Sequence, residues 1–493
     1  MSTLYFFFSS LLFLLLASQS HSHSHSFLIP LSHTLLPLDN YSSLHHLLKT
    51  STLRSTNRHR HRHLPDHHHH HHHHHLSLPL SSGSDYTLSL SLGPTASPTT
   101  VSLFMDTGSD LVWFPCSPFS CILCEGKSPP NSPPPPPPPQ ETHLVSCSSP
   151  SCSAAHSSLP SSDLCAAAAC PLDDIETSSC HSHPCPPLYY AYGDGSLLAH
   201  LRRGRLSFSP NPNPISLPNF TFACAHSALA EPVGVAGFGR GPLSLPAQLA
   251  ALNPSLASRF SYCLVAHSFL PDRLLRPSPL ILGRAADPDR PDLGFVYTPL
   301  LPNPKHPYFY SVSLEAVSIG STRIRTRPDL ASVDRSGNGG MVVDSGTTFT
   351  MLPTDTYSLI ASEFDKRMTK SGFDRAVETE NQTGLKPCYY YLPSRNSGRE
   401  VPGLALHFKG NATVALPRRN YFMGFKSEGK SVGCLMLMDG GGGDGDEEEY
   451  SGPAGTLGNF QQQGFEVVYD LEGGRVGFAR RRCTALWDEL ARG

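Results

Sequence analysis

The chain has 493 residues, of which 16% are charged and 39% hydrophobic, with 39 glycines and 47 prolines. A composition this poor in charge and rich in turn-forming residues is typical of an all-β protein, and the length allows two or three domains. The net charge of −3 lacks the basic footprint of a nucleic-acid-binding protein, so we expect no nucleic-acid partner. The 14 cysteines form an even set, which suits disulfide bonds in a secreted protein.

The N-terminus carries an apolar run from Leu4 to Ala17, followed by the small or polar residues 18–20. This pattern predicts a cleaved signal peptide over residues 1–20. The alternative is a transmembrane anchor, but the run is shorter than the ~20 apolar residues that a membrane-spanning helix needs. No other apolar stretch reaches that length and the C-terminus has no hydrophobic tail, so we expect no membrane anchor.

Residues 21–83 differ in composition from the rest of the chain. They hold 18 of the 27 histidines, nine of them in the run His67–His75. Five lysines and arginines against two aspartates give this segment a net charge of +3, which leaves −6 for the remainder. We interpret it as a separate, poorly structured segment. A metal-binding tract is the alternative, but a low-complexity linker is the favoured interpretation.

The next part of the chain shows strand patterns with few helical ones. Residues 87–92 and 310–315 alternate apolar and polar side chains, which predicts half-buried strands. A helix is predicted after Pro353, where the apolar residues recur at helical spacing, namely Tyr357, Ile360, Ala361 and Phe364. Two low-complexity insertions are expected at the surface, a polyproline II stretch at Pro133–Pro139 and a mobile acidic loop at Gly440–Glu449.

The strongest chemical signal is a pair of similar turns, each containing an aspartate. Asp106 ends an apolar segment and precedes Thr107-Gly108-Ser109, and Asp344 does the same before Ser345-Gly346-Thr347. Glycine lets backbone amides approach such a carboxylate closely, and the hydroxyls of Thr107 and Ser345 could satisfy buried polar groups across the two loops. One such turn is an ordinary loop feature. Two of them, one in each half of the chain, indicate a site built from two carboxylates.

Other catalytic classes have weaker support. The chain has neither an HExxH pattern nor paired CxxC zinc motifs, and the single motif Cys121–Cys124 is expected to form a disulfide. Histidines such as His226 and His407 have no recognisable nucleophile near them in sequence. A glycoside hydrolase also uses two carboxylates, but that function does not explain the duplicated turns. We therefore expect no metal and no cofactor.

The two turns resemble those of pepsin-type aspartic proteases, and more narrowly those of the plant nepenthesin-like branch. The resemblance extends over nearly all of residues 84–485. The resemblance implies an all-β, bilobal pepsin-like fold with pseudo-twofold symmetry and a central substrate cleft. The N-terminal lobe would span 84–285 and the C-terminal lobe 286–493. The catalytic roles would fall to Asp106 and Asp344. Active-site support would come from Thr107, Gly108, Ser109, Trp113, Ser345, Gly346 and Thr347, and the flap and substrate contacts from Tyr192, Gly193, Gly195 and Ser196.

The same resemblance assigns further parts of the chain. Tyr192 matches the flap tyrosine that closes over substrate, and Trp113 matches the tryptophan whose ring N–H supports it. Residues 235–237 and 456–458 match the glycine segments that run beside the two Asp loops. Asp110 and Asp194 lie within the motifs and are interpreted as solvated or structural.

The implied activity is that of an endopeptidase acting on a peptide or protein at acid pH. Two aspartates that share one site hold a single proton between them, and a water between them is the nucleophile. Aspartic proteases are themselves the standard example of this shared proton, so this part of the chemistry comes from the resemblance. The alternative is a non-catalytic cell-wall binding or inhibitor protein on the same fold, since plant relatives of that kind have lost catalytic residues.

Nine cysteines between Cys116 and Cys185 resemble the cysteine-rich insertion of the nepenthesin-like branch, which typically has twelve cysteines overall. The resemblance marks Cys165 and Cys170 as the additional two, bonded to each other, and indicates a bridge between Cys388 and Cys434. Glycosylation motifs occur at Asn40, Asn219, Asn381 and Asn411.

The resemblance also makes residues 21–83 a propeptide that covers the cleft, so that the protein would be a zymogen. We expect its positive charge to complement the acidic mature domain until the cleft carboxylates protonate; assistance to folding alone is the other interpretation. The mature protein is expected to be a secreted monomer of the cell wall, with the vacuole as the alternative location.

Overall fold

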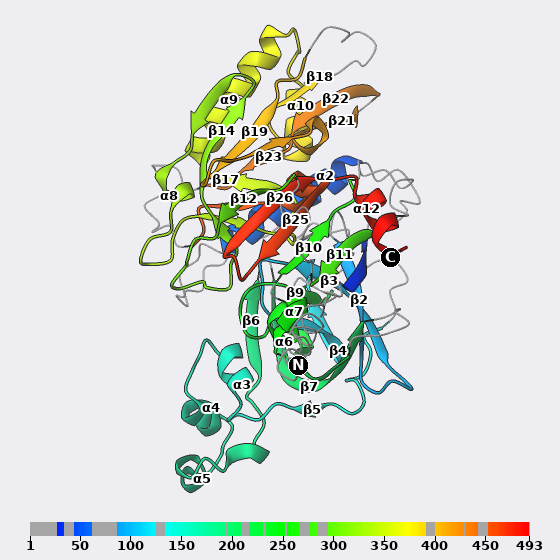
Figure 1. Ribbon diagram of the computed structural model, residues 1–493, viewed down its shortest axis with the longest axis vertical. Coiled ribbons are helices and arrows are strands. Elements are labelled where there is room, and N and C mark those ends of the chain that lie inside the picture. Colours follow the sequence, from blue (N-terminus) through cyan, green and yellow to red (C-terminus); the bar gives the residue numbers. More distant parts are fainter. Residues whose placement is uncertain are drawn as a thin grey trace, which may run out of the picture.

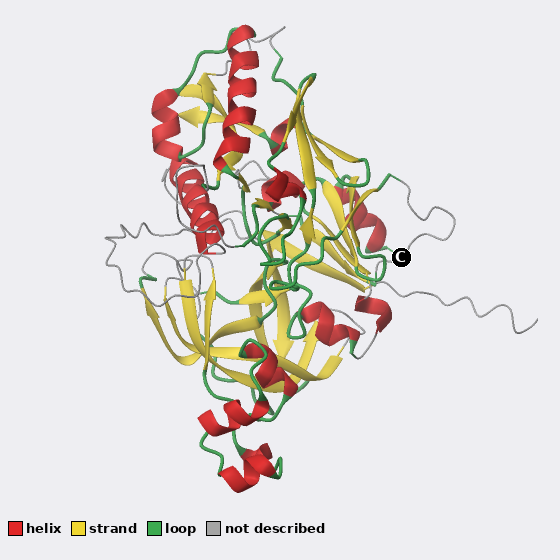
Figure 2. Ribbon diagram, turned by 90° about the vertical axis from the view of Figure 1, so that its left-hand side faces the viewer, coloured by secondary structure: helices red, strands yellow, loops and turns green. Residues whose placement is uncertain are grey.

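The chain forms two lobes built mostly of β-strands in the computed structural model (Figures 1 and 2). The predicted signal peptide, the histidine run, Asn40, residues 193–194 and most of the acidic loop lie outside the described residues. The structure describes residues 27–33, 44–61, 86–124, 134–192, 195–208, 216–229, 233–251, 254–257, 259–266, 276–283, 294–390, 400–427, 429–441 and 452–492.

A 14-stranded sheet forms the N-terminal lobe and continues into the junction between the lobes. Its order is β12-β26-β25-β10-β11-β1-β2-β3-β9-β4-β8-β7-β5, with β6 paired to β7. The strands are β1 (Phe27–His33), β2 (Tyr86–Leu92), β3 (Thr99–Asp106), β4 (Val112–Ile122), β5 (His143–Leu144), β6 (Leu188–Tyr192), β7 (Gly195–Phe208), β8 (Ser216–Leu229), β9 (Val235–Gly237), β10 (Arg259–Cys263), β11 (Ser278–Leu282), β12 (Val296–Pro299), β25 (Phe465–Asp470) and β26 (Arg475–Arg480). Two short helices, α6 (Leu245–Ala250) and α7 (Pro254–Ala257), follow β9.

The C-terminal lobe contains three smaller sheets, of five, four and three strands. The first is β13 (Ser311–Val312), β16 (Met341–Val343), β24 (Gly455–Leu457), β17 (Thr350–Leu352) and β23 (Leu437–Asp439). The second is β15 (Thr322–Arg325), β14 (Leu314–Ile319), β19 (Leu404–Phe408) and β20 (Ala412–Leu416), and the third is β18 (Cys388–Tyr390), β22 (Lys430–Leu435) and β21 (Phe422–Ser427). The helices are α8 (Pro328–Ala331), α9 (Thr354–Lys370), α10 (Val377–Thr383), η3 (Arg418–Asn420), α11 (Asn459–Gln462) and α12 (Cys483–Leu490).

The predicted local elements are present, with more burial than the alternating patterns indicated. Residues 87–92 lie in β2, but Ser91 is buried and its hydroxyl bonds that of Thr100 at 3.1 Å. Of residues 310–315, Ser311 and Val312 lie in β13 and residues 314–315 in β14, and Ser311 and Ser313 are buried as well. The prediction of half-buried strands is therefore wrong at these positions, because neighbouring segments cover both faces. The helix predicted after Pro353 is α9, whose fully buried stripe is Thr356, Ile360, Phe364 and Met368.

The two Asp-containing turns have the same strand surroundings. In the N-terminal lobe β9 runs parallel to β3, with Asp106 opposite Gly237, and antiparallel to β4. In the C-terminal lobe β24 runs parallel to β16, with Val343 opposite Leu457, and antiparallel to β17. The predicted glycine segments therefore lie beside the two loops, and the internal repeat extends to the strand order.

All 14 cysteines form disulfides, seven in total. The predicted bridge Cys388–Cys434 and the closure of the CxxC motif, Cys121–Cys124, are confirmed. The predicted bond between Cys165 and Cys170 is wrong, because each of the two cysteines packs against a different partner in the insertion. The remaining bridges are Cys116–Cys224, Cys147–Cys165, Cys152–Cys185, Cys170–Cys180 and Cys263–Cys483.

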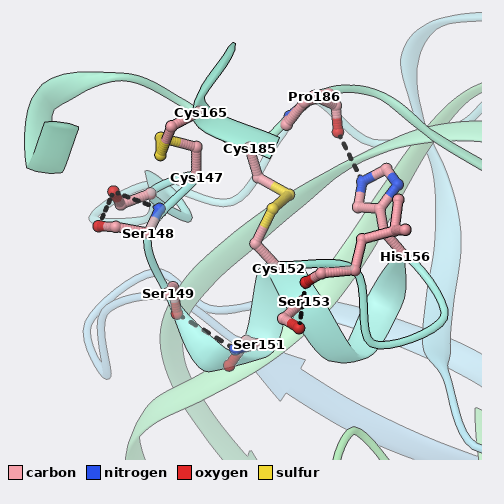
Figure 3. Close-up of a disulfide and its surroundings, with 12 residues drawn as sticks. Cys147, Ser148, Ser149, Ser151, Cys152, Ser153, His156, Cys165, Cys185 and Pro186 are labelled. Carbon is pink, nitrogen blue, oxygen red and sulfur yellow. Dashed lines mark hydrogen bonds between the residues drawn. A yellow bond between two sulfur atoms is a disulfide. The ribbon is translucent and has the colours of Figure 1, made fainter. Parts of the chain in front are cut away.

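The cysteine-rich insertion projects from the N-terminal lobe as short helices (Figure 1). Its elements are α3 (Pro150–Ala155), α4 (Ser161–Ala167), α5 (Leu172–Glu176) and η1 (Cys180–Ser182). Cys152–Cys185 ties α3 to the chain before β6, where a ring nitrogen of His156 lies 3.2 Å from the carbonyl oxygen of Pro186 (Figure 3). The cluster around Cys147, Cys165, Cys170 and Cys180 has only Ala168 and Ile175 as apolar neighbours among the described residues, so disulfides replace a hydrophobic core here.

The N-terminal segment contains two docked elements, β1 and the helix α2 (Leu44–His61). Strand β1 pairs with β11 and β2 in the large sheet. Helix α2 contacts α10, β17 and β23 of the C-terminal lobe. The expectation that residues 21–83 are poorly structured is therefore wrong for these two stretches, since contacts with the rest of the chain, which composition does not reveal, hold them in place. The histidine run between α2 and β2 lies outside the described residues.

Candidate active site

Asp106 lies at the end of β3, buried, with its carboxylate held by its own turn. The N–H of Gly108 donates to Asp106 Oδ1 at 2.9 Å, and Ser109 Oγ donates to Oδ2 at 2.7 Å. These short contacts form because the chain turns back at Gly108, two residues after β3 ends. The carboxylate therefore has a fixed orientation.

Asp344 follows β16 and has the same set of partners. The N–H of Gly346 donates to Asp344 Oδ1 at 2.8 Å, and Thr347 Oγ1 donates to Oδ2. Its side chain is fully buried. Gly346 also brings the two loops together, since a Cβ at this position would lie 2.4 Å from Asp106 Oδ1. The two carboxylates consequently face one space between the lobes.

The residues after the two aspartates bond each other reciprocally. Thr107 N–H donates to Ser345 Oγ at 3.1 Å, and Ser345 N–H donates to Thr107 Oγ1 at 2.9 Å. The hydroxyls then donate onward, Thr107 to the carbonyl of Val343 at 3.1 Å and Ser345 to that of Met105 at 2.9 Å. This network fixes one loop relative to the other, as expected for the two hydroxyl residues.

A layer of buried polar side chains hydrogen-bonds to the backbone of the two loops. The sequence patterns did not indicate this layer. Gln462 Nε2 donates to the carbonyl of Asp344 at 3.2 Å, and Asn459 Nδ2 donates to that of Ser345 at 2.9 Å. The hydroxyls of Tyr262 and Tyr469 lie 2.9 Å apart, and Tyr469 reaches Thr107 Oγ1 at 3.4 Å. Burial raises the pKa of both tyrosines, so they stay neutral hydrogen-bonding groups.

Arg58 of α2 occupies the space between the two carboxylates. Its guanidinium pairs with Asp106 Oδ2 and lies 3.7 Å from Asp344 Oδ2. It also donates to the carbonyl of Gly346 at 2.7 Å. Its side chain is only 11% exposed. The sequence showed only that the N-terminal segment is basic, without distinguishing Arg58 from the other arginines.

The hairpin β6–β7 carries the predicted flap residues. Tyr192 pairs with Gly195 in register, and the turn between them, with Gly193, lies outside the described residues, as does the side chain of Tyr192. Gly195 is buried and Ser196 half-buried at the start of β7. Trp113 on β4 is 1% exposed in the core of this lobe. Its predicted contact with Tyr192 thus stays a prediction.

Tyr190, two residues earlier on β6, is a tyrosine of this hairpin that the motif did not single out. Burial raises its pKa, and so do Tyr308, Asp110 and Asp106 nearby, while Arg58 opposes the shift. A neutral phenol therefore lies in the electrostatic field of Asp106 and Asp110.

Comparison with known proteins agrees with this geometry. Residues 86–284 match the family model described as xylanase inhibitor N-terminal, and residues 309–480 match xylanase inhibitor C-terminal. A probable aspartyl protease of Arabidopsis thaliana is 55% identical over 433 residues, which cover 82% of this chain and 84% of that relative. The chain belongs to the pepsin-like aspartic protease family, in its nepenthesin-like branch.

Other members of the aspartic protease family are more distant. Nepenthesin-1, an aspartic proteinase of Nepenthes gracilis, is 32% identical over 408 residues, covering 81% of this chain and 78% of that relative. Among solved structures, basic 7S globulin from soybean is similar with a TM-score of 0.58 and 19% identity, covering 82% of this chain and 96% of that one. Conglutin gamma from lupine seeds has a TM-score of 0.56 and 19% identity, covering 80% and 91%. These structures confirm the bilobal aspartic protease fold.

The other predicted sites lie away from the aspartate pair. Asn219, Asn381 and Asn411 are exposed, as glycosylation would require. Two groups of possible metal ligands occur in the described residues, but all their cysteines are disulfide-bonded and offer no thiolate; the groups are Cys147/Cys165/Cys180 and Cys152/His156/Cys185. No helix in the described part of the chain is long and apolar enough to cross a membrane.

Proposed function

We propose that the protein is a secreted aspartic endopeptidase made as a zymogen, with Asp106 and Asp344 as its catalytic residues. The observation that carries this is the matched pair of Asp loops. Each carboxylate receives one backbone N–H and one hydroxyl, and the loops exchange two hydrogen bonds through Thr107 and Ser345. A pair of carboxylates in one space, each with a fixed orientation, is the arrangement that acid–base hydrolysis by a shared water needs.

The proposed mechanism uses one proton on the pair. Two neighbouring carboxyls cannot both ionise easily, so one stays protonated at acid pH. The ionised aspartate takes a proton from the water that attacks the scissile carbonyl carbon, while the protonated aspartate donates toward the carbonyl oxygen. The proton then returns to the leaving nitrogen as the C–N bond breaks. The hydroxyls of Ser109 and Thr347 hold the carboxylates in place throughout.

The substrate is proposed to be an extended peptide or protein segment beneath the β6–β7 hairpin. Tyr192, Gly193, Gly195 and Ser196 would contact it, and Trp113 would support the hairpin from the core. An extended chain satisfies its backbone groups by hydrogen bonding to such a strand edge. The assignment of lobes to residues 84–285 and 286–493 places this hairpin in the N-terminal lobe.

Arg58 supports the zymogen part of the proposal. Its guanidinium would occupy the place proposed for the catalytic water, because it bonds Asp106 and lies beside Asp344. The cation favours the ionised form of both carboxylates, so protonation of the pair on acidification would weaken the contact. The remaining parts of the proposal, namely secretion to the cell wall or vacuole, a monomeric state and glycans at Asn219, Asn381 and Asn411, follow from the family resemblance and the exposed asparagines.

A non-catalytic binding protein is the second candidate, and one observation favours it. The family models that match are described as xylanase inhibitor domains. That function would bind a glycan-degrading enzyme and would not need the aspartate pair. The hydrogen-bonded geometry around Asp106 and Asp344 supports catalysis instead.

Cleavage of a denatured protein substrate between pH 3 and 7 tests the proposal. The full chain, incubated at acid pH, would be assayed with and without pepstatin, beside Asp106→Asn and Asp344→Asn. We expect activity at acid pH that pepstatin abolishes and that each substitution lowers by ~10³-fold or more, because each removes a group that moves a proton. A folded protein without its N-terminal segment and without activity would instead support the binding function.

A further inference from the structure

Asp110, four residues after Asp106, points into the glycine-rich segment 237–241. The N–H of Gly241 donates to Asp110 Oδ1 at 2.8 Å. A Cβ built on Gly241 would lie 1.6 Å from Asp110 Oδ2, and one on Gly239 would lie 2.4 Å from Oδ1. The three atoms nearest to the Gly241 position all belong to Asp110. The segment thus forms a cradle that only glycine leaves open for this carboxyl group.

The same segment is bonded to the Asp106 loop at further points. Phe238 N–H donates to the carbonyl of Asp106 at 2.7 Å, and Gly239 N–H donates to that of Ser109 at 2.8 Å. Ser109 in turn donates its hydroxyl to Asp106 Oδ2 at 2.7 Å. The N–H groups of Phe238, Gly239 and Gly241 thus form a ladder of three hydrogen bonds to the Asp106 loop. Asp110 accepts the last of these bonds. The other two hold the backbone of Asp106 and of Ser109, the residue that orients the Asp106 carboxylate.

The segment also reaches the C-terminal lobe. Arg240 N–H donates to the carbonyl of Tyr308 at 2.9 Å, and Tyr310 OH donates to the carbonyl of Phe238 at 2.9 Å. Tyr310 is fully buried, and its ring packs against Phe260 and Tyr469. Residues 237–241 consequently connect the Asp106 loop with the lobe that carries Asp344.

We propose that Asp110 is a positioning residue, whose carboxyl group fastens residues 237–241 to the Asp106 loop and so fixes Asp106 relative to Asp344. This inference rests on the proposed function. Asp110 acts through the bond to Gly241 and through the ladder, not by contact with substrate. Of the two interpretations of Asp110, solvated or structural, the bond from Gly241 supports the structural one, and this role gains a catalytic consequence.

The protonation of Asp110 determines which variant best imitates it. Burial raises its pKa to about 6, although the N–H of Gly241 opposes the shift; the charge of Asp106 adds to it. At pH 4 the group is consequently a neutral carboxyl that still accepts a hydrogen bond. Asparagine has nearly the same shape, is neutral, and keeps an acceptor oxygen. Besides Asp106, Tyr190 and Tyr310 are titratable groups that interact electrostatically with Asp110.

The test measures kcat and KM at pH 4 for the acid-incubated full chain and five variants, one of them a control. Asp110→Ala removes the acceptor, and we expect kcat to fall ~10-fold or more with KM within ~3-fold, since a displaced Asp106 impairs chemistry more than peptide binding. Asp110→Asn should stay within ~3-fold of the wild type. Gly241→Ala should resemble Asp110→Ala, because its methyl group expels the carboxyl.

The double variant Asp110→Ala/Gly241→Ala distinguishes a shared role from two independent ones. We expect it to lose no more activity than either single variant, because the added methyl group then has room; independent effects would multiply. Asp173→Ala, an exposed carboxylate on α5, is the matched control and should match the wild type. Melting temperatures identify any variant that fails to fold, and Asp110→Asn and Gly241→Ala then carry the test.

Three results would overturn the inference. These are an Asp110→Ala protein with wild-type kcat, an Asp110→Asn protein as impaired as Asp110→Ala, and a double variant with multiplied losses. A wild-type protein that cleaves nothing overturns the proposed function itself, and the inference with it. Cleavage by the wild type combined with any of the three overturns the inference alone.

Discussion

Thr107 and Ser345, 238 residues apart in the chain, exchange two hydrogen bonds between backbone N–H and side-chain hydroxyl. Both residues are buried, at 0% and 1% exposure, so neither bond can be replaced by water. These two hydrogen bonds fix the position of one Asp loop relative to the other. Substitution at either hydroxyl should therefore affect both stability and catalysis.

Ser345→Ala should destabilise the protein by ~1–3 kcal/mol, because the N–H of Thr107 and the carbonyl of Met105 both lose a partner in a buried site. Ser345→Thr keeps a hydroxyl and imitates the other loop, so we expect a smaller loss. Denaturant unfolding and kcat measured on the same samples check this. Equal stability of the Ala and Thr variants would contradict it.

Arg58→Met should let the full chain cleave substrate nearer neutral pH than the wild type does. The substitution removes the cation from between Asp106 and Asp344 and leaves the apolar stem in place. Without the guanidinium the two carboxylates also take up their shared proton more readily. The onset of activity as the pH of freshly purified full chain is lowered measures the effect.

Lys49→Met is the matched control, since Lys49 lies on the same helix but is exposed. We expect it to retain the wild-type onset. If both variants shift the onset equally, the total positive charge of the segment keeps the protein inactive at neutral pH, and the specific contact of Arg58 does not.

The cysteine-rich insertion should lose its structure without its bridges. Cys170→Ser/Cys180→Ser removes the bond that closes a loop around α5, in a cluster with only two apolar neighbours among the described residues. We expect rapid proteolytic nicking between residues 160 and 180 while the two lobes stay intact. Mass spectrometry of the limited digest locates the cuts, and an uncut insertion would contradict the prediction.

Asp470 should contribute stability that is lost only at low pH. Burial disfavours its charge, but hydrogen bonds from Arg475 at 2.8 Å and from Gly473 N–H at 2.9 Å outweigh this and hold its pKa below the usual 3.8. A lowered pKa stabilises the folded state above pH ~4 and loses this effect as the pH falls through the folded-state value. Asp470→Asn should lower the melting temperature at pH 6, and its melting temperature should converge with that of the wild type as the pH falls below the lowered folded-state pKa. A constant gap across this range would contradict the assignment.

The candidate site was predictable to the extent that it is local. Asp106 and Asp344 each follow an apolar strand and precede a glycine turn, and a carboxylate bonded by the amide two residues later needs only that local sequence. The repeat of the pattern indicated two lobes, and helix α9 followed from apolar spacing. The branch-specific motifs allowed the family to be recognised before the fold was known.

Contacts between distant segments were not predictable. Nothing near Arg58 in the sequence indicates that α2 brings it to the two aspartates, and the composition around it pointed to a disordered segment. The sequence left Asp110 as either solvated or structural, because its partner in the cradle, Gly241, lies 131 residues later. The pairing of Cys165 failed for the same reason, since spacing along the chain does not give the distance between sulfur atoms.

The sequence by itself determined the all-β class, the two Asp loops and the chemistry that two carboxylates can perform, because turn geometry and strand patterning are encoded within a few residues. The tertiary structure decided which groups surround those carboxylates: the reciprocal hydroxyls, the tyrosines beneath, the cradle of Asp110 and the guanidinium of Arg58. Each of these depends on the packing of segments that lie far apart in the sequence, and such packing is set by the whole chain and by no single motif.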